Sequence, residues 1–139
     1  YISEPVYYYR IIESSITHIY KANMPEINNA IFQAFNEFLS INDNFQKFEK
    51  MYYATVVRRL EQIISKYFLC KSNPSSRKEV IKEMNKTLRM EPYRTAVKKV
   101  EVKKLIRRHK ALVYFSRTKS AFLVCQFYNV KDAILKMLH

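Results

Sequence analysis

The sequence has no glycine and no tryptophan, and only 4 prolines and 2 cysteines among its 139 residues. Without glycine, the chain cannot build a glycine-rich phosphate loop, a dinucleotide-binding fingerprint or the nucleophile elbow of a hydrolase. Tight hairpin turns also favour glycine, so few strands and many helices are expected. The hydrophobic fraction of 48% and the length suit a single globular domain rather than a disordered chain.

The two cysteines, Cys70 and Cys125, lie in apolar helical contexts and lack the spacing of metal ligands. We interpret them as buried thiols of a protein from a reducing compartment. The sequence has no signal peptide and no uncharged run of about 18 apolar residues, so no membrane-spanning helix is predicted. Its start at Tyr1, inside an apparent strand, indicates a fragment of a longer protein.

Positive charge is concentrated in the second part of the chain. Residues 1–50 contain 4 Lys/Arg and 6 Asp/Glu, a net charge of −2, whereas residues 51–139 contain 21 and 6, a net charge of +15. A domain this basic indicates an anionic partner: nucleic acid, anionic lipid headgroups or a phosphorylated substrate.

The first 24 residues differ from the rest of the chain. Residues 4–9, EPVYYY, form an aromatic run after a proline, which predicts a short edge strand. Residues 10–24 show no helical period and contain several small hydroxyl residues, which predicts a loop. Because a lone strand is unstable, we expect its partner strands to belong to a missing domain. An exposed edge could instead pair with another copy of the chain and form a homo-oligomer.

Helical periodicity dominates residues 25–139. A first helix is predicted over 25–40. The following apolar stripe is predicted to be its buried face: Ile27, Ala30, Ile31, Ala34, Phe35, Phe38 and Leu39. Asp43 with Gln46 resembles a capping box that opens a long second helix, ending before Ser72. This long helix should be the spine of the domain.

Three further helical segments follow. Ser76 and Glu79 form a second capping box and predict a helix that ends at Glu91, which precedes a proline. Residues 92–115 are predicted to be helical, in one or two pieces, and a final helix spans about 118–138.

Together these patterns predict an all-α fold, a bundle of about four to six helices preceded by one short strand and loop. We predict two parts. Residues 1–24 are the end of a missing catalytic domain, and residues 25–139 are a basic helical C-terminal domain.

The segment EPVYYYRIIESSIT resembles a segment of family-2 glycosyltransferases of the bacterial polysaccharide type. In that family, a strand with a Y-x-Y-R core is followed by a short loop and S-I-[ST], which close the nucleotide-sugar-binding domain. Residues 7–10 and 15–17 match this pattern, whereas Ser14 departs from it, since glycine or asparagine often stands there. A basic, aromatic helical tail often follows in the family, as it does here.

The resemblance implies an inverting enzyme that transfers a sugar from a nucleotide-sugar donor to a lipid-linked or polysaccharide glycan acceptor. It also implies a divalent metal, Mg²⁺ or Mn²⁺, held by a D-x-D motif in the whole enzyme. This chain contains no such motif, so no cofactor and no catalytic residue are expected within it. The expected location is the cytoplasm, on the inner face of a bacterial plasma membrane.

Arg10 is the strongest candidate for a substrate contact. A guanidinium at the end of a strand, followed by the hydroxyls of Ser15 and Thr17, is suited to bind phosphate or sugar oxygens. In a family-2 transferase, such a cation would stabilise the charge on the leaving nucleoside diphosphate. The alternative is that Arg10 pairs with Glu4 or Glu13 and only holds the loop.

Two aromatic side chains of the same segment are further candidates. His18 could donate a hydrogen bond to the same phosphates or move a proton, or it could be an ordinary surface residue. Tyr8 could stack on a sugar ring, although tyrosines on a strand usually face the core or the edge. Farther along, His109 lies on an apolar stripe and is interpreted as a packed histidine.

A basic face is predicted on the helical segment 92–115. Its members are Lys99, Lys103, Lys104, Arg107, Arg108 and Lys110. Cations opposite an apolar stripe, with Tyr114 nearby, are typical of a helix that lies on an anionic membrane surface. The same cations could contact nucleic-acid phosphates, which would make the chain a free-standing nucleic-acid-binding or scaffold module. A third interpretation is a face that is only solvated.

Overall fold

The structure is a computed structural model that describes residue 20 and residues 22–41, 45–118 and 120–137, apart from the side chains of residues 132, 135 and 136. Its elements are α1 (Met24–Ile41), α2 (Phe45–Ile63), a π-helical turn η1 (Ile64–Phe68), α3 (Arg77–Arg89), α4 (Tyr93–Lys99), a 3-10 turn η2 (Val102–Lys104), α5 (Arg107–Arg117) and α6 (Ala121–Met137). The predicted all-α class is confirmed. The predicted strand and most of the loop after it lie outside the described residues.

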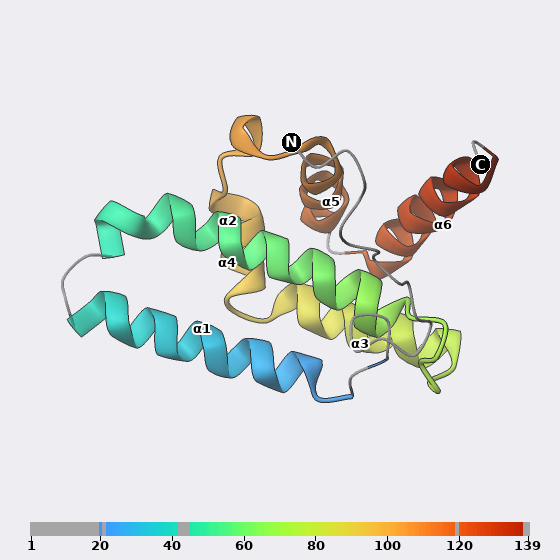
Figure 1. The fold of residues 1–139 in the computed structure, drawn as a ribbon, viewed down its shortest axis with the longest axis horizontal. Helices are drawn as coiled ribbons and strands as arrows, with labels where there is room; N and C mark the ends of the chain where they lie inside the picture. Colours follow the sequence, from blue (N-terminus) through green and yellow to red (C-terminus); the bar gives the residue numbers. More distant parts are fainter. Residues whose placement is uncertain (1–19, 21, 42–44, 119, 138–139) are drawn as a thin grey trace, which may run out of the picture.

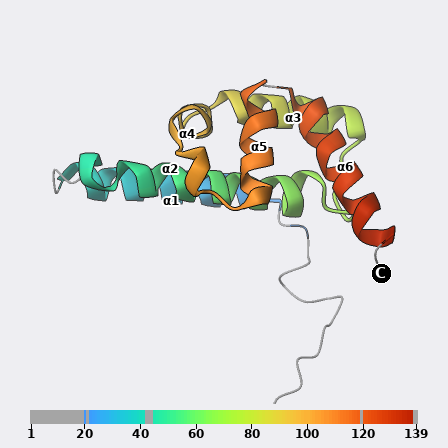
Figure 2. The same ribbon diagram turned by 90° about the horizontal axis from the view of Figure 1, so that it is seen from above.

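The helices form two layers. α1 and α2 lie side by side and antiparallel in one layer, and α3 to α6 lie over one side of them (Figures 1 and 2). α2 packs against α1, α4, α5 and η1, so the predicted spine is confirmed. α6 packs against α3 and α5, and its C-terminal half projects from the body (Figure 1).

The core is built on the apolar surface of α2 and η1. Its most completely buried side chains there are Val56, Val57, Leu60, Ile63 and Ile64. These positions recur at intervals of three and four residues, which places them on contiguous faces of one helix. Neighbouring elements contribute Met84, Ala96, Leu112 and Val124. A single apolar core therefore joins both layers.

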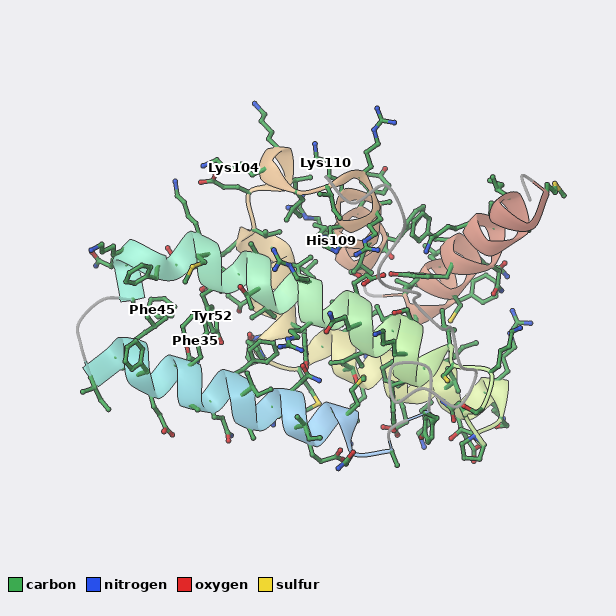
Figure 3. All side chains as sticks on the ribbon, viewed as in Figure 1. Phe35, Phe45, Tyr52, Lys104, His109 and Lys110 are labelled. Atoms are coloured by element: carbon green, nitrogen blue, oxygen red, sulfur yellow. The ribbon has the colours of Figure 1, made fainter. Side chains whose placement is uncertain are left out.

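Aromatic rings fill the space between α1 and α2. Tyr52 of α2 lies between Phe35 and Phe45, with ring centroids 5.5 and 5.8 Å away (Figure 3). Phe32 of α1 meets Tyr52 and Tyr93 edge-on, at 6.3 and 5.9 Å. Edge-on contacts of this kind add to the stabilisation that area burial provides. The rings bring α1, α2 and α4 together.

The predicted buried face of α1 is correct at Phe35 and Leu39 and wrong at its other five positions. Phe32 and Leu39 are buried, whereas Ile27 and Ile31 are exposed and Phe38 is 61% exposed. Apolar residues cover more than one face of this helix, so the periodicity fits two orientations. The face that carries Phe32 is buried because its ring fits among the aromatic rings of α2 and α4.

The N-terminus of α3 has the predicted capping box. The Ser76 hydroxyl accepts a hydrogen bond from the Glu79 backbone N–H at 3.3 Å, and the Ser76 backbone N–H donates to the Glu79 carboxylate at 2.8 Å. Side-chain oxygens thereby accept hydrogen bonds from two of the four N–H groups that have no partner at the start of an α-helix. Hydrogen bonds to the carboxylate lower the pKa of Glu79.

The predicted helical segment 92–115 consists of two helices. α4 ends at Lys99, the 3-10 turn η2 follows, and α5 begins at Arg107. Backbone angles are extended at Val100, at Glu101 and again at Ile106, so the helix is interrupted on both sides of η2. Consequently, the predicted basic residues do not share one helical face.

Replacing Ser76 by alanine should lower the free energy of unfolding by about 1 kcal/mol, because the first turn of α3 loses its side-chain acceptor. Urea denaturation followed by circular dichroism measures the change. Ser75→Ala is the matched control, since the hydroxyl of this neighbouring serine forms no hydrogen bond with a described residue. Equal destabilisation by both substitutions would contradict the capping role.

Candidate polyanion-binding surface

The candidate substrate contacts of the N-terminal segment lie outside the described residues. They are Tyr8, Arg10, Ser15, Thr17 and His18. Their proposed roles stay predictions.

The predicted basic residues gather where α4, η2 and α5 meet. Lys99 ends α4, Lys103 and Lys104 belong to η2, and the other three lie in the first turns of α5. Lys104 and Lys110 are found at the same edge of the molecule, on the side away from α1 (Figure 3). We call the set Lys99, Lys103, Lys104, Arg107, Arg108 and Lys110 the basic surface.

Lys99 is engaged by α2 rather than free for a ligand. Its Nζ donates to the Glu49 carboxylate at 2.9 Å and lies 5.5 Å from the centre of the Tyr53 ring. The hydrogen bond and charge of Lys99 lower the pKa of Glu49, and Glu49 in turn raises the pKa of Lys99. This exposed pair connects the end of α4 to the start of α2.

Glu101 binds two lysines at once. Its carboxylate lies 2.6 Å from Lys50 Nζ and 2.9 Å from Lys104 Nζ. Hydrogen bonds from Lys50 and Lys104 lower the pKa of Glu101 to about 2. The carboxylate therefore stays ionised and neutralises part of the basic surface. Lys50 could not be predicted as part of this site, because no sequence pattern connects it to Glu101, 51 residues further along the chain.

Four cations of the basic surface form no ion pair with a described residue: Lys103, Arg107, Arg108 and Lys110. Arg107 and Arg108 occupy the first turn of α5, and Ile106 at the N-cap provides no side-chain hydrogen bond. The N-terminus of a helix carries partial positive charge and unpaired N–H groups. Two arginines at this position add to that charge, and the combination favours an anion.

A shallow groove of about 310 Å³ is lined by one of these cations, Lys110. Its lining includes Val102, Lys110 and Tyr114, and Tyr114 is 72% exposed. Ile106, at the start of α5, is also exposed. Cations therefore stand beside large apolar side chains that face solvent. This combination is typical of surfaces that enter the interfacial zone of a membrane.

Arg117 fixes α5 against α4. Its Nε donates to the Val97 carbonyl at 3.1 Å and its Nη2 to the Lys98 carbonyl at 3.5 Å. Both carbonyls belong to the last turn of α4, where backbone acceptors lack partners within the helix. No sequence pattern predicts this role of Arg117, because its partners are backbone atoms of another helix.

His109 is buried between α5 and α2, as interpreted from the sequence. The side chain is 6% exposed, and its Nε2 has no hydrogen-bond partner among the described residues. Burial lowers the pKa of His109, and the charges of Arg108 and Arg58 act in the same direction, against Glu61. The imidazole is therefore held neutral within the core and is not part of the basic surface.

The described residues contain no group of three or more His, Cys, Asp or Glu side chains that could hold a metal ion. These residues therefore provide no ligand set for the divalent metal that the resemblance implies for the whole enzyme. Within the same residues, no helix is both long and apolar enough to cross a membrane.

Comparison with protein-family models, with curated proteins and with solved structures finds no match to this chain.

Replacing His109 by glutamine should make stability less dependent on pH. Because the folded state lowers this pKa below 6.5, the unfolded chain binds the proton first as the pH falls. Stability is therefore full above pH 6.5 and is lost below it, by at most about 1.4 kcal/mol per pH unit for one proton. Urea titrations between about pH 7.5 and 5 measure the slope. His139→Gln is the control, and an unchanged slope in His109→Gln would refute the assignment.

Proposed function

We propose that this chain is the C-terminal helical part of a family-2-like glycosyltransferase and that its basic surface attaches the enzyme to an anionic membrane. The first part rests on the resemblance of EPVYYYRIIESSIT and on the basic helical tail that follows it. The second part rests on the geometry of α5.

The observation that carries the membrane attachment is the N-terminus of α5. Arg107 and Arg108 stand at the positive end of the helix, without an ion pair to a described residue, beside the exposed side chain of Ile106. Lipid phosphates would meet the guanidinium groups and free backbone N–H groups, and the apolar side chain would enter the interface. Juxtamembrane cations attract anionic lipids additively, so even a small cluster gives measurable binding.

Attachment of this kind suits an enzyme whose acceptor is lipid-linked. The whole enzyme would transfer a sugar from a nucleotide-sugar donor to a lipid-linked or polysaccharide acceptor, with inversion. Arg10 and the hydroxyl groups of Ser15 and Thr17 would contact the donor, and the divalent metal would belong to the missing catalytic domain. This chain would act as support and as the contact with the inner face of the plasma membrane.

Nucleic acid is the competing partner, because the same cations can contact the phosphates of a duplex or a single strand. The two partners differ in what they require of Ile106 and Tyr114. A membrane takes up exposed apolar side chains, whereas nonspecific binding to duplex phosphates depends on the cations alone.

The triple substitution Lys103→Gln, Arg107→Gln and Arg108→Gln should weaken binding to vesicles of phosphatidylglycerol and phosphatidylcholine by roughly a hundredfold, since three surface cations are lost. Vesicle sedimentation at physiological salt measures the partition coefficient. The control is Lys78→Gln, Lys82→Gln and Arg89→Gln, which removes equal charge from exposed positions on α3.

Equal loss in both triple variants would show that only net charge matters and would overturn the assignment of the surface. A mixed-sequence DNA shift assay run in parallel separates the partners. Tighter binding to DNA, unaffected by Ile106→Ser, would favour the nucleic-acid module and refute the membrane attachment.

Replacing Glu101 by glutamine should strengthen vesicle binding severalfold, because Lys50 and Lys104 lose the carboxylate that neutralises them. The same sedimentation assay measures the change, and circular dichroism checks that helix content is retained. Glu37→Gln on α1 is the control. It changes the net charge of the chain by the same +1, but Glu37 forms no ion pair with a described lysine. An equal gain in both variants would contradict the role of Glu101.

A further inference from the structure

A cavity of about 220 Å³ lies on the other side of the molecule, between the first turns of α1, the π-helical turn η1 and α3. In Figure 1, α1 and α3 run along the lower part of the view, away from η2 and α5. The charged, tyrosine and methionine side chains of its wall are Glu26, Tyr67, Glu83, Lys86, Met90 and Tyr93. The volume admits a small molecule, below the range of drug-sized sites.

The π-helical turn shapes one wall. The Leu69 backbone N–H donates to the Ile64 carbonyl at 2.9 Å, which closes a turn one residue wider than in an α-helix. Tyr67 and Phe68 of this turn both reach the cavity, and Tyr20 stacks on Tyr67 with ring centroids 5.2 Å apart. Single π-helical turns inside helices occur frequently at functional sites.

The wall carries unneutralised negative charge. Glu26 and Glu83 form no ion pair with a described residue, although the chain has 25 Lys/Arg. Lys86 is the single cation of the wall, so the wall has a net charge of −1 within a chain of +13. Burial, Tyr20 and the charges of both carboxylates raise the pKa of Tyr67 to about 12.

Tyr93 provides an independent sign of a ligand. Its side chain is 5% exposed and lines the cavity, yet its hydroxyl has no hydrogen-bond partner among the described residues. Burial raises the pKa of Tyr93 to about 12, so the group stays a neutral hydroxyl that can both donate and accept. The hydroxyl is not among the fully enclosed polar atoms, so it opens toward the cavity, where a bound polar atom can replace water as its partner.

We propose that this cavity binds a small organic cation that carries a primary amine. The Glu26 and Glu83 carboxylates attract the ammonium group, the aromatic side chains of Tyr67 and Phe68 line the wall, and the Tyr93 hydroxyl accepts a hydrogen bond. Met90 provides apolar contact for the carbon skeleton. The proposal is independent of the membrane attachment, because the two sites share no residue.

Methionine methyl resonances test the proposal on the whole chain. Titration with 1,4-diaminobutane, up to about 10 mM to cover millimolar affinity, should shift the Met90 methyl signal saturably. The Met51 methyl, exposed outside the cavity, should not move. The neutral 1,4-butanediol and the dianion succinate have similar length and should give no saturable shift. Absence of a Met90 shift with the diamine, or equal shifts with the diol, would overturn the proposal.

Isosteric variants locate the site. Glu83→Gln and Glu26→Gln should each weaken diamine binding about fivefold, because each removes one partly solvated carboxylate. The matched control is Glu37→Gln, which removes an equal charge from α1 outside the cavity and should leave the affinity unchanged. Unfolding curves confirm that the variants remain folded. Equal weakening in all three variants would show a nonspecific charge effect and refute the site.

Discussion

Burial of the apolar surface of α2 is the interaction on which the rest of this structure depends. Val56, Val57 and Leu60 are shielded by α1 from one layer and by helices of the second layer. Because the interior is packed to the density of an organic crystal, the facing side chains determine where each surrounding helix can lie. The basic surface lies on the outer side of helices that this core holds in place, whereas the cavity borders the core, because Phe68 and Tyr93 belong to both.

Much of the fold could be predicted from the sequence. Periodicity indicated the long helix, and the capping box at Ser76 marked the start of α3 to the residue. The orientation of α1 could not be predicted, because its apolar residues cover two faces and only tertiary contacts with Phe32 choose between them. The π-helical turn could not be predicted either, because its residues continue the apolar periodicity of α2 and include no glycine or proline that would indicate a change of helix type.

The residues of the candidate sites also fall into those that could be predicted from the sequence and those that could not. Charge counts alone located the cations around η2, because they are adjacent in sequence. The contribution of Lys50, by contrast, depends on a contact across the fold with Glu101. The cavity escaped prediction for the same reason: Glu26, Glu83 and Tyr93 come from three helices, and no local pattern connects them. Sequence patterns report neighbours along one element, whereas these groups become neighbours only when the core forms.

Arg117 has a mechanical consequence. One guanidinium at the C-terminal end of α5 donates to two carbonyls at the end of α4, so it joins the C-terminal ends of the two helices. Arg107 lies at the opposite, N-terminal end of α5. A small rotation of the helix about its C-terminal end would therefore displace Arg107 by a larger distance. The direction in which this chain presents Arg107 and Arg108 thus depends on the core packing of α5 and on a contact about 15 Å away along the helix axis.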